Sequence, residues 1–374
     1  MYFWRPGQQV GKDLANRAGK DLDMKDNAIL LTAGVLTGAN AKTAHGLIRS
    51  SSRYTIIGVI DSASAGQDAG YLLDKVQREI PIYAGVGDFA AQSERRAKYA
   101  IVGVAFAGGR LPEPIVAQIR EAIAAGISIV SGAHDFLSDM PEMQELARQH
   151  GVTLLDIRKP RPKDELKFWS GEIMQVTAPV IAVMGTDCAL GKRTTAVMIT
   201  DAMKSRGLRS EMVFTGQTGW LQGHKYGFVL DSTYNDFISG ELEHAVVTCW
   251  RETDPDVIFI EGQSALCNPS GPCGAEFLLS AQSKGVILQH SPAREFYKGQ
   301  EHTGVRISLM RELELIRLYG SKVLAITLNT SKLSRTEARI FQEKIGQETG
   351  LPVILPLEDG VDELSAIVKA YINR

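Results

Sequence analysis

The sequence predicts an α/β protein made of two tandem, doubly wound domains. Short apolar runs alternate with amphipathic stretches along most of the chain, and a charged, proline-containing stretch interrupts this alternation near the middle. In the second half, one apolar run leads through a glycine loop into a helix that starts with lysine. Apolar strands that alternate with helices are typical of mostly parallel sheets covered on both faces.

The first half carries six apolar runs of strand length. They are bounded by turn-forming residues, as strands usually are, and they cover residues 28–35, 54–61, 80–86, 99–106, 127–132 and 152–157. Apolar residues at helical spacing predict helices over residues 113–125 and 140–150, and a helix that ends within residues 75–79.

The charged stretch RKPRPKDELKFWSG (residues 158–171) is typical of a linker. After it the sequence predicts strands over residues 180–184, 209–215, 257–261, 285–289, 323–329 and 351–355, with clear helices at 336–349 and 362–373. We therefore expect an N-terminal arm or extension (1–24), a first α/β domain (25–160), a linker (161–178) and a second α/β domain (179–374).

Composition narrows the class of protein. The chain has 374 residues, which is enough for two cores, and a formal net charge of −2, which gives no electrostatic footprint for nucleic acid or a membrane. Four cysteines make no disulfide framework at this size, and no apolar stretch is long enough to span a bilayer. We expect a cytoplasmic protein with reduced thiols that forms homo-oligomers and acts on a small molecule.

The segment VIAVMGTDCALGKRTTAVMI (residues 180–199) points to specific chemistry. An apolar run is followed by a glycine-bounded loop, and Lys192 then opens an amphipathic helix. Backbone N–H groups, the helix dipole and the lysine charge together form an anion cradle, whose usual ligand is a polyphosphate. The residues expected to bind it are Gly185, Thr186, Asp187, Gly191, Lys192, Arg193, Thr194 and Thr195.

This loop departs from the common phosphate loop in two ways. Five residues separate its glycines instead of four, and Arg193 follows the lysine where Ser or Thr usually ligates Mg²⁺. Because a guanidinium cannot bind a cation, we expect no metal at this site. Coenzyme A fits such a loop, because side-chain charge can meet its diphosphate and ribose phosphate.

Two other strand ends carry groups suited to acid–base chemistry. Glu261 ends the run 257–261, where it could take a proton from a bound amine. His290 and Arg294 follow the run 285–289, as a reserve proton carrier and a clamp for a substrate carboxylate. The carboxyl ends of parallel strands form the ligand crevice of such folds. Glu261 could instead be a loop or helix-capping residue, and His290 a hydrogen-bonded structural one.

Gln217 and Asn329 also follow predicted strands. Gln217 lies in TGQTGW and could bind the cofactor, and Asn329 ends ITLN and could contact the edge of a nucleobase. Ordinary turn chemistry would explain either residue as well.

Several motifs together resemble one bacterial family, long catalogued as a domain of unknown function. They are GTDCALGKRTT, TGQTG, EGQSAL, NPSGPCGAEF and ILQHSPAR. The resemblance implies a Rossmann-like N-terminal domain and a P-loop NTPase-like C-terminal domain. Some members are described as D-glutamate N-acetyltransferases, which implies acetyl transfer from acetyl-CoA to an amino acid, with D-glutamate as the expected acceptor.

A more distant resemblance, to dethiobiotin synthetase, keeps a second function open. The loop that begins Gly-Thr-Asp and the Glu-Gly pair at Glu261 match that group. It implies an ATP- and Mg²⁺-dependent ligase or kinase in which Asp187 or Glu261 holds the metal. A third hypothesis is a sensor that binds a nucleotide or CoA without catalysis.

Overall fold

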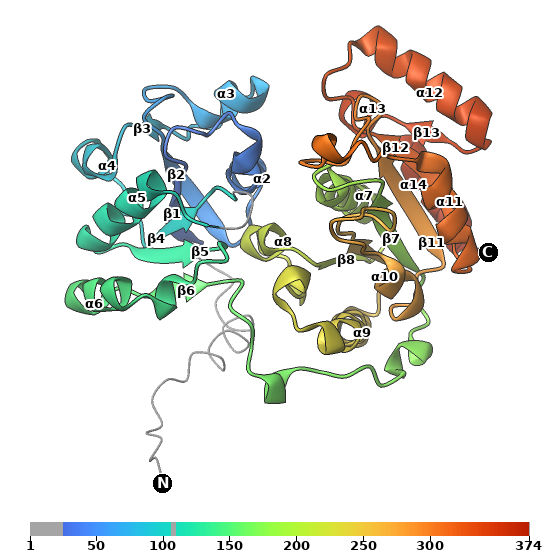
Figure 1. Cartoon of the computed structure of the whole chain (residues 1–374), viewed down its shortest axis with the longest axis horizontal. Helices are drawn as coiled ribbons and strands as arrows, with labels where there is room; N and C mark the ends of the chain where they lie inside the picture. The colour runs from blue at the N-terminus through green and yellow to red at the C-terminus, as the bar shows by residue number, and fades with distance from the viewer. Residues whose placement is uncertain (1–24, 106–109, 374) are drawn as a thin grey trace. The chain divides into compact units, whose positions relative to one another are not determined.

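The computed structural model describes residues 25–105 and 110–373, so the expected arm at residues 1–24 lies outside the described part. The chain forms two compact units (Figure 1). Of the described residues, the first unit comprises 25–105, 110–162 and Gln217–Lys225, and the second comprises Lys163–Gly216 and 226–373.

The first unit is built on a six-stranded parallel sheet of order β3-β2-β1-β4-β5-β6. Its strands are β1 (Asp26–Leu31), β2 (Tyr54–Ile60), β3 (Ile82–Tyr83), β4 (Tyr99–Val102), β5 (Ser128–Ser131) and β6 (Leu154–Asp156). Its helices include α2 (Lys42–Arg49), α3 (Ala69–Asp74), α4 (Val86–Gln92), α5 (Glu113–Ala124) and α6 (Pro141–His150). The strand order reverses at β1, which is the doubly wound arrangement.

One predicted helix end in this unit is wrong. The helix expected to end within residues 75–79 is α3, and it ends at Asp74. Lys75 caps it in the left-handed conformation, with φ of 63°, and its backbone N–H donates to the carbonyl of Tyr71. The left-handed residue breaks the helical repeat, so residues 75–79 form the approach to β3 instead.

The second unit is built on a seven-stranded parallel sheet of order β13-β12-β11-β7-β10-β8-β9. Its strands are β7 (Val180–Gly185), β8 (Ser210–Phe214), β9 (Tyr226–Gly227), β10 (Val257–Glu261), β11 (Gly285–His290), β12 (Lys322–Leu328) and β13 (Val353–Ile354). Its helices are α7 (Lys192–Ser205), α9 (Asn235–Thr253), α10 (Ala275–Leu279), α11 (Leu309–Leu318), α12 (Arg335–Thr349), α13 (Pro356–Asp359) and α14 (Asp362–Ile372).

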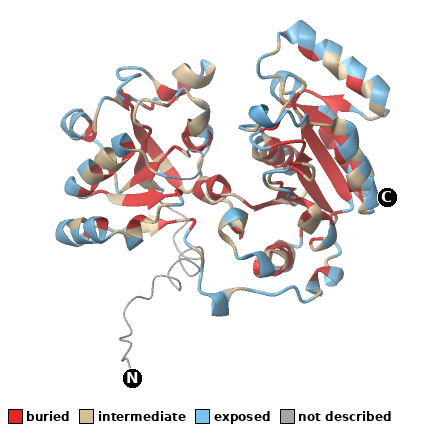
Figure 2. Cartoon of the chain, viewed as in Figure 1, coloured by how far each residue is buried: buried red, intermediate tan, exposed pale blue. Residues whose placement is uncertain are grey.

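The central strands of both sheets are buried, as Figure 2 shows. All six residues of β7 and all five of β10 are buried, which explains why the sequences of these strands are nearly continuous apolar runs rather than alternating ones. The two doubly wound α/β units confirm the predicted fold class. Within residues 25–105 and 110–373, none of the helices combines the length and the apolar character needed to cross a bilayer.

A short helix, α8 (Gln217–Gln222), follows β8 in sequence but belongs to the first unit. Leu221 is 1% exposed and joins the hydrophobic core of that unit. Arg53 stacks on the Trp220 ring at 4.1 Å from its centroid and donates to the Trp220 carbonyl at 2.8 Å. The segment 217–225 is thus an integral part of the first unit, although it falls within the stretch 179–374 expected to form the second domain.

Candidate functional site

The predicted strand, glycine loop and helix are all present in the second unit. β7 lies between β10 and β11, and the loop at residues 186–191 joins it to α7. Gly191 has φ of 102° and Ala189 has φ of 52°, so the chain turns through two left-handed residues before the helix starts. In the described part of the chain, no backbone N–H from Asp187 to Gly191 makes a well-aligned hydrogen bond to another residue.

The side chain of Lys192 is buried beneath this loop. Its Nζ donates to the carbonyl oxygens of Asp187 at 2.6 Å and Ser264 at 2.9 Å, and the residue is only 6% exposed. Burial lowers the pKa of the ammonium, because the charged form loses hydration. An anion in the loop would restore a favourable partner for this charge.

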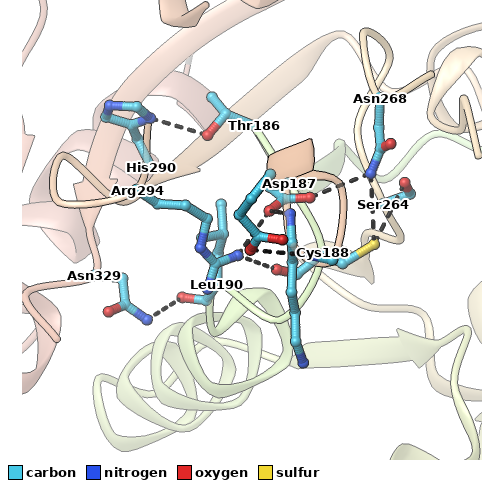
Figure 3. A network of polar contacts seen from close by, with 12 residues as sticks. Thr186, Asp187, Cys188, Leu190, Ser264, Asn268, His290, Arg294 and Asn329 are labelled. Atoms are coloured by element: carbon cyan, nitrogen blue, oxygen red, sulfur yellow. Dashed lines mark hydrogen bonds and ion pairs between the residues drawn. The ribbon is translucent and has the colours of Figure 1, made fainter. Parts of the chain in front are cut away.

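Asp187 connects the phosphate loop to two other loops (Figure 3). Its carboxylate is fully buried and accepts hydrogen bonds from Asn268 Nδ2 at 3.2 Å, Arg294 Nη1 at 2.8 Å and the Lys298 backbone N–H at 2.9 Å. Both carboxylate oxygens are therefore engaged by donors of the protein.

Arg294 lies against the loop itself. Its Nη1 donates to the Asp187 carboxylate and also to the Cys188 carbonyl at 2.6 Å, and the side chain is 27% exposed. The predicted clamp for a substrate carboxylate therefore already holds a carboxylate of the protein through one of its nitrogens.

His290 is the last residue of β11 and lies beside Thr186, the first residue of the phosphate loop. Its Nδ1 lies 2.9 Å from the Thr186 hydroxyl, and Figure 3 shows the ring directed at that residue. Burial lowers the pKa of the imidazole to about 4. The ring is therefore neutral near pH 7, which suits a hydrogen-bonding role better than the storage of a proton.

Glu261 ends β10 and is 4% exposed. Burial raises the pKa of its carboxyl group, and the positive charges of Arg193 and Lys192 and the backbone N–H groups of Thr215 and Gly216 partly oppose the shift. The Thr215 N–H donates to Oε2 at 3.2 Å. A carboxyl group with a raised pKa within electrostatic reach of the cradle is a candidate proton acceptor.

The remaining predicted cradle residues have distinct surroundings. Thr194 is exposed at the start of α7, whereas the Thr195 hydroxyl donates to the buried Gln289 Oε1 at 2.6 Å. Gly185 packs against the Lys192 side chain, since a Cβ there would lie 3.0 Å from Lys192 Cδ. The Thr195 hydroxyl therefore connects α7 to β11 of the sheet.

Asn329 follows β12 and holds the phosphate loop. Its Nδ2 donates to the Leu190 carbonyl at 2.8 Å and its Oδ1 accepts from the Ser331 N–H at 2.9 Å, so both ends of the amide are engaged. A cavity of about 240 Å³ adjoins the following residues. It is lined by Thr330, Leu333, Ser334, Arg335, Ala338 and Glu358.

Gln217 belongs to the first unit, whereas the phosphate loop belongs to the second. It opens α8 and is 4% exposed, and its Oε1 lies so close to Gly132 that a Cβ at that glycine would clash at 1.2 Å. Within the described residues, this oxygen has no hydrogen-bond donor.

Three residues around the loop were not expected from the sequence: Ser264, Asn268 and Lys298. Asn268 lies in the turn-rich segment after Glu261, and the sequence NPSGPCG signals an irregular loop but not its partner. Lys298 contributes only its backbone N–H, which no residue type would reveal.

Comparisons with known proteins agree with this architecture. Residues 167–365 match the P-loop domain of the DUF1611 family, described as a domain of unknown function, and residues 62–160 match its Rossmann-like domain. A crystal structure of a DUF1611 family protein from Anabaena variabilis superposes with a TM-score of 0.83 at 28% identity, covering 92% of this chain and 100% of that one.

Two curated relatives bear the name D-glutamate N-acetyltransferase. The protein from a Pseudoalteromonas species is 32% identical over 276 residues, which is 72% of this chain and 81% of the relative. The protein from Tritonibacter scottomollicae is 29% identical over 281 residues, covering 72% and 82%. On this sequence similarity and on its two domains, the chain belongs to the DUF1611 family.

Proposed function

We propose that this protein transfers the acetyl group of acetyl-CoA to the amino group of an amino acid, with D-glutamate as the first acceptor to test. The names of the two curated relatives support the reaction and the acceptor. The observation that carries the choice of CoA is the donor set of the phosphate loop. Its cations are side chains, namely Lys192, Arg193 and Arg294, and both oxygens of the Asp187 carboxylate accept hydrogen bonds from donors of the protein.

The loop has the chemistry that a diphosphate requires. Amide N–H groups of residues 187–191 are available, Lys192 is buried beneath them, and α7 begins at the end of the loop. The surface cavity lined by Thr330, Leu333, Ser334, Arg335, Ala338 and Glu358 directly follows Asn329 in the chain, and its polar and apolar side chains together suit an adenine ring. We assign the diphosphate to the loop and the adenine to this cavity.

Glu261 is the proposed proton acceptor for the attacking amine. Acetyl-CoA supplies an activated acetyl group; the amine nitrogen forms a bond to the acetyl carbon as the C–S bond breaks, and the CoA thiolate leaves. Glu261 takes the proton that the amine loses, and this proton can then pass to the thiolate, so charge and protons balance. Burial suits Glu261 to the task, because a raised carboxyl pKa lies closer to that of the amine.

This assignment has a geometric consequence for the carrier. The charges of Lys192 and Arg193 act on Glu261, so the carboxylate lies near the cradle. The pantetheine arm of CoA separates the thioester from the diphosphate. The arm must therefore fold back over the loop for Glu261 to serve the acetyl group.

The same proximity favours a second candidate, the ATP- and Mg²⁺-dependent ligase or kinase, since an acidic residue beside a phosphate loop suits phosphoryl chemistry. The protein would have to bind the metal without Asp187, whose oxygens are engaged, and without a hydroxyl directly after Lys192. Acetyl transfer makes no such demand, and we prefer it for this reason.

The test is incubation of the purified protein with acetyl-CoA and a panel of D- and L-amino acids. Thiol release and the mass of the product report transfer, and a parallel series with ATP and Mg²⁺ reports nucleotide turnover. We expect thiol release with D-glutamate. If none of the amino acids in the panel gives thiol release, the proposal is refuted. ADP formation would then identify a ligase or kinase, and CoA binding without turnover would identify a sensor.

A further inference from the structure

The pairing of Arg294 with Asp187 leaves most of the guanidinium group unused. Both of its hydrogen bonds come from Nη1, to the Asp187 carboxylate and to the Cys188 carbonyl. A guanidinium has five N–H donors. Among the described residues, no acceptor lies within hydrogen-bonding geometry of Nε or Nη2 of Arg294.

The two acceptors also fix where the unused donors lie. Asp187 and Cys188 are consecutive residues of the phosphate loop, so the guanidinium is held directly against that loop (Figure 3). Asp187 itself is held by Asn268 and by the Lys298 N–H, and its carboxylate is fully buried. A buried carboxylate with three donors has little freedom to rotate, so it orients Arg294 firmly.

The geometry points to Arg294 as a ligand of the carrier's diphosphate, with Asp187 as its positioning residue. An anion in the loop would meet the loop amides and Lys192 on one side and the free guanidinium edge on the other. Arg294 then supplies the charge that a divalent cation supplies in loops with a hydroxyl after the lysine. This inference rests on the proposed function, and it assigns Arg294 to the phosphates rather than to the carboxylate of the acceptor.

Steady-state kinetics separate the two assignments. KM is measured for acetyl-CoA at saturating D-glutamate, and for D-glutamate at saturating acetyl-CoA, in wild type and Arg294→Ala. We expect Arg294→Ala to raise the KM of acetyl-CoA at least about 10-fold and to leave that of D-glutamate within about twofold. Arg317→Ala, which removes an exposed arginine from α11, is the matched control and is expected to change neither value. A rise confined to the KM of D-glutamate, or no rise in either, would overturn the inference.

A double-mutant cycle tests the role of Asp187. If Asp187 acts through Arg294, Asp187→Asn raises the KM of acetyl-CoA in wild type but adds little in the Arg294→Ala background. Additive effects would instead show that Asp187 acts separately, and would overturn its assignment as a positioning residue.

Calorimetry with inorganic diphosphate provides a measurement that is independent of catalysis and of the Asp187 variant. We expect Arg294→Ala to weaken diphosphate binding at least about 10-fold. Equal affinity in wild type and Arg294→Ala would refute the phosphate assignment even if acetyl transfer is found. Absence of acetyl transfer in wild type would refute the proposed function and leave the diphosphate comparison valid.

Discussion

The ammonium group of Lys192 donates to the carbonyl oxygen of Ser264 at 2.9 Å, and thereby ties the phosphate loop to the segment that follows Glu261. The same Nζ donates to the Asp187 carbonyl at 2.6 Å. An ammonium group has three N–H donors, so one remains for a phosphate that enters the loop while the two carbonyls keep theirs. One cation then joins the phosphate, the loop and Ser264, which lies three residues from the proposed proton acceptor.

Lys192→Ala is expected to abolish most activity while the fold is kept. We predict a fall in kcat/KM of about 100-fold or more, because the buried cation opposite the phosphates is lost. Circular dichroism and Tm should change little, since burial already penalises this charge. Lys204→Ala is the control, because Lys204 lies near the end of the same helix and pairs with Glu211 at 3.3 Å. An unimpaired Lys192→Ala enzyme would remove the cradle from the proposal.

Glu261→Gln is expected to lower kcat by about 10²- to 10⁴-fold, the usual effect of losing a general base. It should also raise Tm at neutral pH. The folded chain holds the Glu261 proton more tightly than the unfolded chain, so the free energy of unfolding falls as pH rises through the raised pKa. Glutamine cannot ionise, so the free energy of unfolding of the variant does not fall in this way as pH rises.

Glu312→Gln provides the matched control for that experiment. Glu312 is fully buried on α11 and burial also raises its pKa, but the proposed reaction does not use it. Glu312→Gln should therefore flatten the pH dependence of stability and keep kcat within a few-fold. A Glu261→Gln enzyme with normal kcat would show that another group accepts the proton.

His290 should make the protein less stable in acid. The imidazole pKa is about 4 in the folded chain and near 6.5 when unfolded, so between these values only the unfolded chain is extensively protonated. The free energy of unfolding should therefore fall as pH drops from 6.5 to 4, by about 3 kcal/mol at most for this group.

Denaturation of His290→Asn over the same pH range checks this. Asparagine can keep the contact with Thr186 but has no proton to gain, so the variant should lose this part of the pH dependence. Identical pH slopes in the two proteins would mean that His290 titrates normally.

Acetyl transfer should continue in excess EDTA. The expected charges at the phosphates are side chains, and both oxygens of Asp187 accept from Asn268, Arg294 and Lys298. Initial rates of thiol release with EDTA and with added Mg²⁺ should agree within error. A rate that collapses in EDTA and returns with Mg²⁺ would favour the ligase or kinase.

The strand, loop and lysine of the phosphate site could be predicted because they are local in sequence. The partners of Asp187 could not, since Asn268, Arg294 and Lys298 are 81, 107 and 111 residues away. Arg294 and Asn329 could be singled out because each follows a predicted strand, but their partners could not be predicted. Arg294 donates to the Asp187 carboxylate, and Asn329 donates to the Leu190 carbonyl. Residue type and spacing give the chemistry of a side chain, whereas its partner depends on which strand ends the sheet order brings together.

The location of helix α8 could not be predicted from the sequence either. Its membership of the first unit can be tested through Leu221. Six residues are too few for a helical pattern to stand out, and their location depends on a surface formed by α2 and Arg53. Because Leu221 is 1% exposed in the core of the first unit, Leu221→Ala should lower the free energy of unfolding by about 2–5 kcal/mol.

The loss should be localised to the first unit. Hydrogen exchange should speed up in β4, β5 and α2, whereas the amides of β7 and β11 should keep their protection. Leu318→Ala is the control, because that leucine is 66% exposed on α11 and its truncation should change stability by less than about 0.5 kcal/mol. Faster exchange in β7 and β11 with unchanged protection in β4 and β5 would show that α8 stabilises the second unit instead, and would contradict its membership of the first.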